Sequence, residues 1–407
     1  MLLKLAWRNI WRNRRRTYIT AASVLFAVVL AAFMQAIQKG AWDQMVQNVV
    51  NFYYGYAQIH SSGYWEEQSL EKAFPESERW SKLPEQFEGL LGVVPRIESF
   101  ALASAGNLTR GVLLIGTDPA REDAMTRLSE RLTGGAYLQP DDAGALVAEG
   151  VAAFLKLGVG DTIVLISQGY HGVNAAGKYP IRGIVKFGSP ELNKRMVFLP
   201  LRPAQQFYGA EGLLTSLALH VADKDAVPHL VRKLRRFLGP EFEVLDWQEM
   251  MPELVEAREI DTAGNYVVMF ILYLIIAFGI FGTILMMTKE REYEFGILLA
   301  IGMHRRQLGF VVWLEILLLG FLGVLAGLLL ALPLIYHFHV NPLDFTQMSD
   351  QMADAYEKFG FEPIFPAAFE WLVFGTQMTV VFLITSVLAF YPLLKIRTLQ
   401  PVEAMRR

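Results

Sequence analysis

The sequence predicts an α-helical membrane protein with four transmembrane helices and a large mixed α+β extracytoplasmic domain inserted between spans 1 and 2. Hydrophobic residues make up 53% of the 407 residues, which is too many for an ordinary soluble protein. Four stretches have the roughly 20 apolar residues that are needed to cross a bilayer. They occupy residues 17–38, 264–288, 307–337 and 371–394, and residues 39–263 have the composition of a soluble domain.

Residues 1–16 predict a cytoplasmic amphipathic helix that lies in the membrane interface. Leu3, Trp7, Ile10 and Trp11 share one helical face, and basic residues without any acid surround it. Tryptophan at headgroup depth and arginine on lipid phosphate are typical of such helices. A nucleic-acid site is the alternative reading of a basic run. The adjoining span favours anionic lipid instead, so we expect no nucleic-acid partner.

The first span also has the basic leader of a signal peptide. Its apolar run is longer than the usual 7–15 residues or so, and no small-residue cleavage site follows it. We therefore expect residues 17–38 to be a retained transmembrane anchor.

The distribution of Lys and Arg orients the spans, because cytoplasmic loops carry an excess of both. The leader, residues 289–306 and the tail 395–407 are rich in basic residues. By contrast, the loop 338–370 has one lysine against six acids, and residues 39–263 have 22 basic against 29 acidic residues. We expect both termini and residues 289–306 to be cytoplasmic, and the other two segments to lie outside.

Residues 39–263 combine strand and helix patterns. Helical spacing at 42–53 and 247–259 predicts two stalks that extend the first and second spans outward. Between the stalks we expect two lobes, roughly 55–140 and 141–246. The predicted strands are 93–102, 108–116, 145–149, 162–167, 179–186, 195–199 and 215–221, and the predicted helices are 119–132, 150–157 and 228–238.

An apolar stripe on the first stalk has two readings. Trp42, Met45, Val46 and Val49 recur at helical spacing with polar residues opposite. Packing against the second stalk is one explanation. The other is a groove open to the outer leaflet, which could hold acyl chains or another amphipathic substrate.

The motifs of common enzymes are missing from the sequence. There is no GxxxxGK[ST], HExxH or GxSxG, and there is no cysteine. His337 and His339 are two residues apart, which sends them to nearly opposite sides of a helix, so a metal site is not expected. The chain is expected to have no catalytic residues, no metal and no bound cofactor.

Two features of the third span allow two explanations each. Glu315 is an ionisable group inside a span, which suggests proton transfer. The alternative is a structural role, because Glu315 can reach Arg305 and Arg306 near the cytoplasmic end of the span. Three small residues also lie in this span: Gly320, Gly323 and Gly327. They predict a close helix contact, either within the chain or along a dimer seam.

The loop 289–306 differs from a simple turn between spans. It reads as a short helix with charges at both ends and an apolar stripe of Phe295, Leu298 and Leu299, with Gly302 one turn on. That pattern is typical of a helix that docks onto a soluble partner.

Several sequence segments resemble the permease subunits of the MacB/FtsX/LolC–LolE class of ABC transporters, and the lipoprotein-releasing branch in particular. The most specific are EREYEFGILLAIGMHRRQL at 290–308, the tail YPLLKIRTLQPVEAMRR at 391–407 and the leader LAWRNIWRNRRRT at 5–17. In the outer domain, GTDP at 116–119 and LGVGD at 157–161 are also similar. The resemblance covers the whole chain.

The resemblance implies that residues 289–306 form a coupling helix seated on a separate P-loop ATPase, which binds ATP and Mg. Two ATPases would pair with two permease chains, identical or homologous, in a bacterial inner membrane. With the apolar stripe included, the implied contact residues are Glu290, Arg291, Glu294, Phe295, Gly296, Leu299, Ala300 and Gly302.

The leading hypothesis is therefore a mechanotransmitting permease that extracts or moves an amphipathic substrate, such as a lipoprotein, from the outer leaflet, with a periplasmic acceptor protein as a further partner. A second hypothesis is a transmembrane signalling module that activates a periplasmic partner such as a cell-wall hydrolase. A third is efflux of an amphipathic small molecule or peptide, and a fourth is an intramembrane enzyme centred on Glu315.

Overall fold

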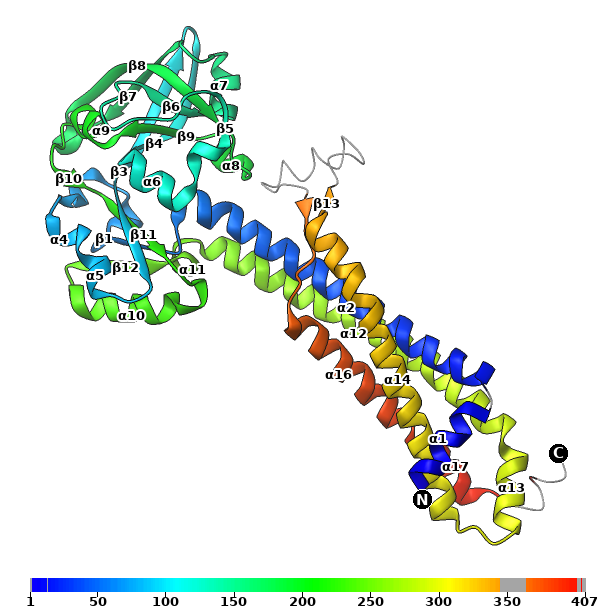
Figure 1. Cartoon of the computed structure of the whole chain (residues 1–407). Helices are drawn as coiled ribbons and strands as arrows, with labels where there is room; N and C mark the ends of the chain where they lie inside the picture. Colours follow the sequence, from blue (N-terminus) through cyan, green and yellow to red (C-terminus); the bar gives the residue numbers. More distant parts are fainter. Residues whose placement is uncertain (1, 13, 345–363, 401–403, 405–407) are drawn as a thin grey trace. The chain divides into compact units, whose positions relative to one another are not determined.

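The structure is a computed structural model that describes residues 2–12, 14–344, 364–400 and 404 (Figure 1). The chain folds into two compact units. The helical unit holds the described residues up to Asp43, from Arg258 to Asp344 and from Ile364 onward; the sheet unit holds residues 44–257. Each unit has its own hydrophobic core.

The helical unit contains long helices and one short strand pair. Four helical stretches are long and apolar enough to cross a membrane, which confirms the four predicted spans. The elements that contribute to this unit are α1 (Leu2–Arg12), α2 (Arg14–Val49), α12 (Pro252–Glu290), α13 (Glu292–Ala300), α14 (Arg305–Val340), β13 (Leu343–Asp344), β14 (Ile364–Phe365), α16 (Trp371–Leu388) and α17 (Phe390–Thr398). Helices α2 and α12 contribute residues to both units.

Helix α1 has the exposure that an interfacial helix requires. Leu3, Trp7 and Trp11 are each more than two-fifths exposed. Ile10, which was expected on the same face, is instead buried in the core of the helical unit. The predicted amphipathic helix is therefore present, with Ile10 turned inward as its anchor.

Gly320, Gly323 and Gly327 of α14 make close contacts within the chain. A Cβ on Gly323 would lie 2.6 Å from Cβ of Val24, and one on Gly327 would lie 2.8 Å from Cβ of Val28. Both partners belong to α2. A Cβ on Gly320 would lie 2.7 Å from a methyl carbon of Thr385 in α16. Packing within the chain therefore accounts for the small-residue pattern.

The sheet unit is built on a ten-stranded mixed sheet with the order β12-β1-β11-β3-β4-β9-β6-β8-β5, and β7 pairs with both β3 and β8. Its strands are β1 (Ala57–Ser61), β3 (Leu90–Ala105), β4 (Leu108–Thr117), β5 (Leu132–Gly135), β6 (Ala145–Ala148), β7 (Thr162–Gln168), β8 (Asn174–Val185), β9 (Met196–Pro200), β11 (Ser216–Val221) and β12 (Phe242–Asp246). A separate pair joins β2 (Phe74–Pro75) to β10 (Leu213–Leu214).

Short helices join these strands. They are α3 (Tyr64–Glu67), α4 (Glu78–Ser81), α5 (Leu83–Gln86), α6 (Pro119–Thr126), α7 (Glu149–Leu155), α8 (Pro190–Asn193), α9 (Leu201–Tyr208), α10 (Val227–Leu238) and α11 (Trp247–Met250). The seven predicted strands and three predicted helices all have counterparts, although the helix expected at 119–132 is α6 followed by a 3₁₀ turn at Leu128–Arg131.

The predicted division into lobes at residue 140 is wrong. Strands β1, β11 and β12 come from both ends of the sheet unit and lie together at one end of the strand order. Strand β3 pairs with β11 at its start and with β7 near its end. The two halves of the sheet are therefore continuous through β3, so residues 55–140 do not form a separate lobe.

The two predicted stalks end differently. Helix α2 continues to Val49 and is extended by a π-helical turn, Val50–Tyr54, that Gly55 ends with a positive φ of 67°. The second stalk is interrupted at Met251, because α11 ends at Met250 and α12 begins at Pro252, where proline suits a first helical turn.

Candidate functional site

The inner face of α13 packs into its own chain. Phe295 is 1% exposed and Gly296 is buried. Leu298 and Leu299 are partly buried against the same core. Phe295, which was expected on a stripe facing a partner, is therefore covered by its own chain, and Leu298 and Leu299 are partly covered.

The outer face of α13 carries a second apolar stripe, which we call the outer stripe. It consists of Tyr293 and Ile297 in α13 and of Ile301, which caps its C-terminal end; they are 54%, 37% and 75% exposed. Residues four apart lie on one helical face, so these side chains stand in a row. The sequence pattern contained this row, but the neighbouring Phe295 stripe has the same spacing and nothing in the sequence distinguishes inside from outside.

Three further predicted contact residues are exposed. They are Glu290, Ala300 and Gly302. Gly302 has a φ of +102° and no atom within 4 Å of an added Cβ, so the backbone conformation, not a neighbour, requires glycine there.

A chain of charges joins three helices on the inner side of α13. Arg291 donates from Nη1 to both carboxylate oxygens of Glu315 in α14, each at 2.7 Å. Its Nε is 3.3 Å from Glu294 of α13. Glu294 also accepts from Arg12 of α1 at 2.5 Å.

The Arg291–Glu315 pair corrects two expectations. The partner of Glu315 is Arg291 from the loop, not Arg305 or Arg306. The side chains of Arg291 and Glu315 are 7% and 5% exposed, so the Arg291 guanidinium, which was expected at a partner contact, is covered by its own chain. Breaking a buried pair on one side costs about 3–5 kcal/mol, and the pair therefore fixes α13 against α14.

The sheet unit contains a cavity of about 630 Å³ beside the first stalk. Met45 and Val49, two of the four predicted groove residues, line it. Its other described lining residues include methionines and aromatic rings, among them Tyr53, Tyr54, Tyr64, Trp65, Met196, Met250 and Met251. Methionine adapts to irregular apolar ligands, and the volume suits a small-molecule site.

The other two predicted groove residues lie elsewhere. Trp42 donates from Nε1 to Asp261 of α12 at 2.6 Å, and Gln38 donates to the same carboxylate at 3.2 Å. Trp42 therefore makes a polar contact with α12, two residues beyond the predicted second stalk, and does not line the cavity. Val46 is half-buried and is not among the residues that line the cavity.

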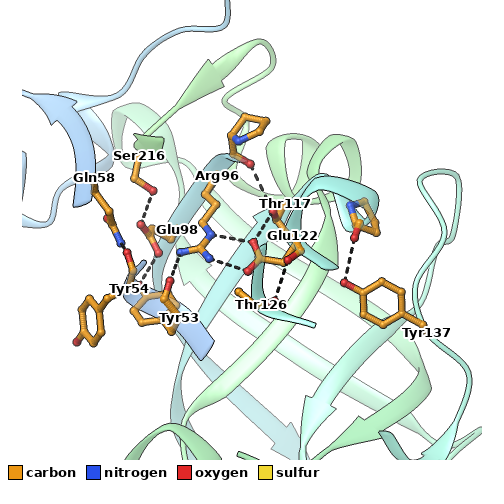
Figure 2. A network of polar contacts seen from close by, with 12 residues as sticks. Tyr53, Tyr54, Gln58, Arg96, Glu98, Thr117, Glu122, Thr126, Tyr137 and Ser216 are labelled. Carbon is orange, nitrogen blue, oxygen red and sulfur yellow. Dashed lines mark hydrogen bonds and ion pairs between the residues drawn. The ribbon is translucent and has the colours of Figure 1, made fainter. Parts of the chain in front are cut away.

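A buried ionic network, which the sequence pattern did not predict, ties the end of the first stalk to the sheet (Figure 2). Arg96 of β3 binds both carboxylate oxygens of Glu122 in α6, at 2.9 and 2.6 Å. Its Nη1 donates to the Tyr53 carbonyl oxygen at 2.6 Å. The Tyr53 hydroxyl and the Ser216 hydroxyl each donate to Glu98 at 2.5 Å.

The protonation states in this network follow from burial and charge. Burial alone would lower the pKa of Arg96, but the adjacent Glu122 carboxylate outweighs it and the pKa rises. Burial and then the charge of Glu98 raise the pKa of Tyr53. Tyr53 therefore stays protonated and donates. The signal in the sequence was an Arg and a Glu inside an apolar strand, a pattern that by itself predicts only the strand.

Groups of residues able to hold a metal ion are absent from the described part of the chain. His339 instead has its Nδ1 2.9 Å from the carbonyl oxygen of Ala367. Four helices long and apolar enough to cross a membrane, a charged loop helix and a strand-rich inserted domain define the class as a multi-pass membrane protein.

Comparison with known proteins gives the family. The model of the MacB-like periplasmic core domain matches residues 17–237, and that of the FtsX-like permease C-terminal domain matches residues 266–401. The first covers more than half of the chain. The chain belongs to the family of ABC transporter permeases of the MacB/FtsX/LolC type.

Two curated relatives are lipoprotein-releasing system transmembrane proteins LolC. The protein from Neisseria meningitidis is 23% identical over 259 residues, which cover 60% of this chain and 61% of that protein. The one from Xylella fastidiosa is 26% identical over 250 residues, covering 58% and 59%. The chain thus spans about three-fifths of the length of these relatives.

The periplasmic region of MacB from Actinobacillus actinomycetemcomitans is a similar solved structure. It is 12% identical to this chain and has a TM-score of 0.35. The match covers 52% of this chain and 95% of that chain.

Proposed function

We propose that this chain is a permease subunit driven by a separate ATPase that docks on the outer stripe of α13. The observation that carries the proposal is the exposure of Tyr293, Ile297 and Ile301 on a helix whose other face is anchored by the buried Arg291–Glu315 pair. Apolar side chains in a row on a helix suit a hydrophobic groove of a partner. A helix that is fixed against neighbouring helices can transmit a displacement to them, whereas a loosely held loop would not.

We propose that a movement of α13 reaches two other helices through two ion pairs. The Arg291–Glu315 pair leads to α14, and the Glu294–Arg12 pair leads to α1. Helices α2 and α12 meet at Asp261 through Trp42 and Gln38. Because both helices contribute to the sheet unit, we propose that they carry the motion to it.

The proposed substrate is an amphipathic molecule, and a lipoprotein in particular, taken from the outer leaflet of a bacterial inner membrane. Two relatives are named as parts of a lipoprotein-releasing system. The cavity beside Met45 and Val49 has methionines and aromatic rings that suit an acyl chain, together with charged residues such as Glu191 and Arg195 that suit the polar end of an amphiphile. A second permease chain and a periplasmic acceptor complete the proposed assembly. An ATPase homodimer would bind ATP and Mg. The sheet unit would lie outside the cytoplasm.

Charged variants of the outer stripe test the ATPase contact. In full-length chain coexpressed with its ATPase, Ile297→Asp and Ile301→Asp should each abolish copurification and the stimulation of ATP hydrolysis, because a carboxylate would be desolvated on docking. Leu91→Asp is the matched control, since Leu91 is 59% exposed in the sheet unit. Normal stimulation in both stripe variants would contradict the proposal.

Photocrosslinking tests the substrate. A photoreactive residue at Met45 or Val49 should capture acylated protein in membranes, whereas one at Val46 should capture much less. Capture of a hydrolase, with no acylated protein, would contradict transport and support the signalling alternative.

A further inference from the structure

A second cavity in the sheet unit has a different character from the one beside Met45. Its volume is about 930 Å³. It lies where the π-helical turn, the end of α6, strand β5 and strand β11 meet. The described residues that line it are Val50, Asn51, Gly55, Tyr56, Ala124, Met125, Thr126, Arg127, Glu130, Arg131, Leu132, Thr133, Lys186, Gly188, Leu219, His220 and Val221.

Three cationic residues line this cavity. Arg127 and Arg131 are separated by one 3₁₀ turn, in which the Glu130 amide donates to the Arg127 carbonyl oxygen at 3.1 Å. The Lys186 amide donates to the Arg131 carbonyl oxygen at 3.0 Å, so the backbones of these two residues are adjacent. Burial lowers the pKa of His220, so this imidazole is neutral at neutral pH.

The cations outnumber the acids here, against the charge of the surrounding domain. Glu130 is the acidic residue among the described lining residues, whereas residues 39–263 carry 22 basic and 29 acidic residues. In the described part of the chain, Arg127 makes no ion pair. Lys186 is 3.8 Å from Glu149, and both side chains are more than two-fifths exposed, so that pair is weak.

The rest of the wall is apolar. Val50, Met125, Leu132, Leu219 and Val221 line the same cavity. Its volume is at the upper end of the range for small-molecule sites and far exceeds the space that a single oxyanion fills. Guanidinium groups bind phosphate oxygens in a bidentate manner. The lining therefore matches a phosphate that is attached to an apolar body.

We propose that this cavity binds a phosphate-bearing amphiphile, with Arg127, Arg131 and Lys186 on the phosphate and the apolar wall against its hydrocarbon part. This site is distinct from the Met45 cavity, and it does not depend on the ATPase contact, because binding to it is measured on the chain alone.

The test uses full-length chain in a non-ionic detergent, with lipid binding measured by native mass spectrometry. The probes are phosphatidylglycerol and inorganic phosphate, and phosphatidylcholine reports on zwitterionic lipid. Arg127→Asn and Lys186→Gln should each weaken phosphatidylglycerol binding by about tenfold, the loss expected for one hydrogen bond to a charged group.

Two variants make the test independent of folding. Arg127 lies in the left-handed region with a φ of +49°, which asparagine tolerates. Lys156→Asn is the matched control, because Lys156 caps α7 with a φ of +56° and does not line the cavity. Glu130→Gln removes the opposing charge and should tighten phosphatidylglycerol binding, a gain that misfolding cannot produce.

Each outcome supports or overturns the phosphate site. Weaker binding in Arg127→Asn and tighter binding in Glu130→Gln, with Lys156→Asn unchanged, support it. Equal binding in all four variants would overturn it. Binding of inorganic phosphate as tight as that of phosphatidylglycerol would overturn the amphiphile and identify a soluble phosphate compound as the ligand class.

Discussion

At the scale of single residues, the Arg291–Glu315 pair decides how the loop helix is held. Both side chains are almost fully buried, and one guanidinium nitrogen contacts both carboxylate oxygens. The net contribution of such a pair to stability is small. Losing one partner nevertheless destabilises the fold strongly, because it leaves a buried charge unpaired. It therefore sets one position of α13 against α14, which is the property a coupling element needs.

Exchanging the two charges tests the pair. Glu315→Gln and Arg291→Met should each lower ATP-driven activity, and each should destabilise the chain by about 3–5 kcal/mol, because a buried charge loses its partner. The combined exchange Arg291→Glu with Glu315→Arg should recover much of both. Activity at the native level in Glu315→Gln would show that the pair is dispensable for coupling.

The Arg96–Glu122 pair makes a second prediction at this scale. Glu122→Gln should speed hydrogen exchange in β3 and α6 markedly, because the Arg96 guanidinium, 0% exposed, would keep its charge without a counterion. Glu149→Gln is the control, since its partner Lys186 is exposed. Unchanged exchange in β3 for Glu122→Gln would contradict a structural role for the network.

At the scale of elements, the close contact of α14 with α2 depends on glycine. Gly323→Leu should destabilise the purified chain by several kcal/mol and lower its unfolding temperature, because backbone and Val24 atoms occupy the space. Gly279→Leu in α12 should be tolerated, since an added Cβ there meets no atom within 4 Å. Equal unfolding temperatures for the two variants would show that α14 packs differently.

The sequence predicted most elements because their signals are local. Apolar length marked the spans, and strand patterns at 93–102 and 108–116 marked the two strands of the β3–β4 hairpin. The lobe boundary failed because strand order depends on pairings such as β1 with β11, which join residues far apart in the chain. The prediction of which face of α13 is exposed was wrong for a related reason. Phe295 and Ile297 both belong to apolar rows, and only the packing of the helical unit's core shows which row is covered.

At the scale of the whole molecule, the exposed outer stripe belongs to the helical unit and a ligand-sized cavity belongs to the sheet unit. Helices α2 and α12 contribute to both units. We propose that the energy of ATP hydrolysis on a separate chain enters at the outer stripe and is used at the sheet unit. The Met45 cavity and the cationic cavity would then bind different parts or different kinds of amphiphile.

The most direct test of the central claim is site-specific crosslinking of α13 to the ATPase. The chain has no cysteine, so single-cysteine variants report one position each. Ile297→Cys and Ile301→Cys should crosslink to the ATPase in assembled membranes, and Phe295→Cys on the buried face should not. Crosslinks from Phe295→Cys alone, or from none of the three in an active complex, would contradict docking on the outer stripe.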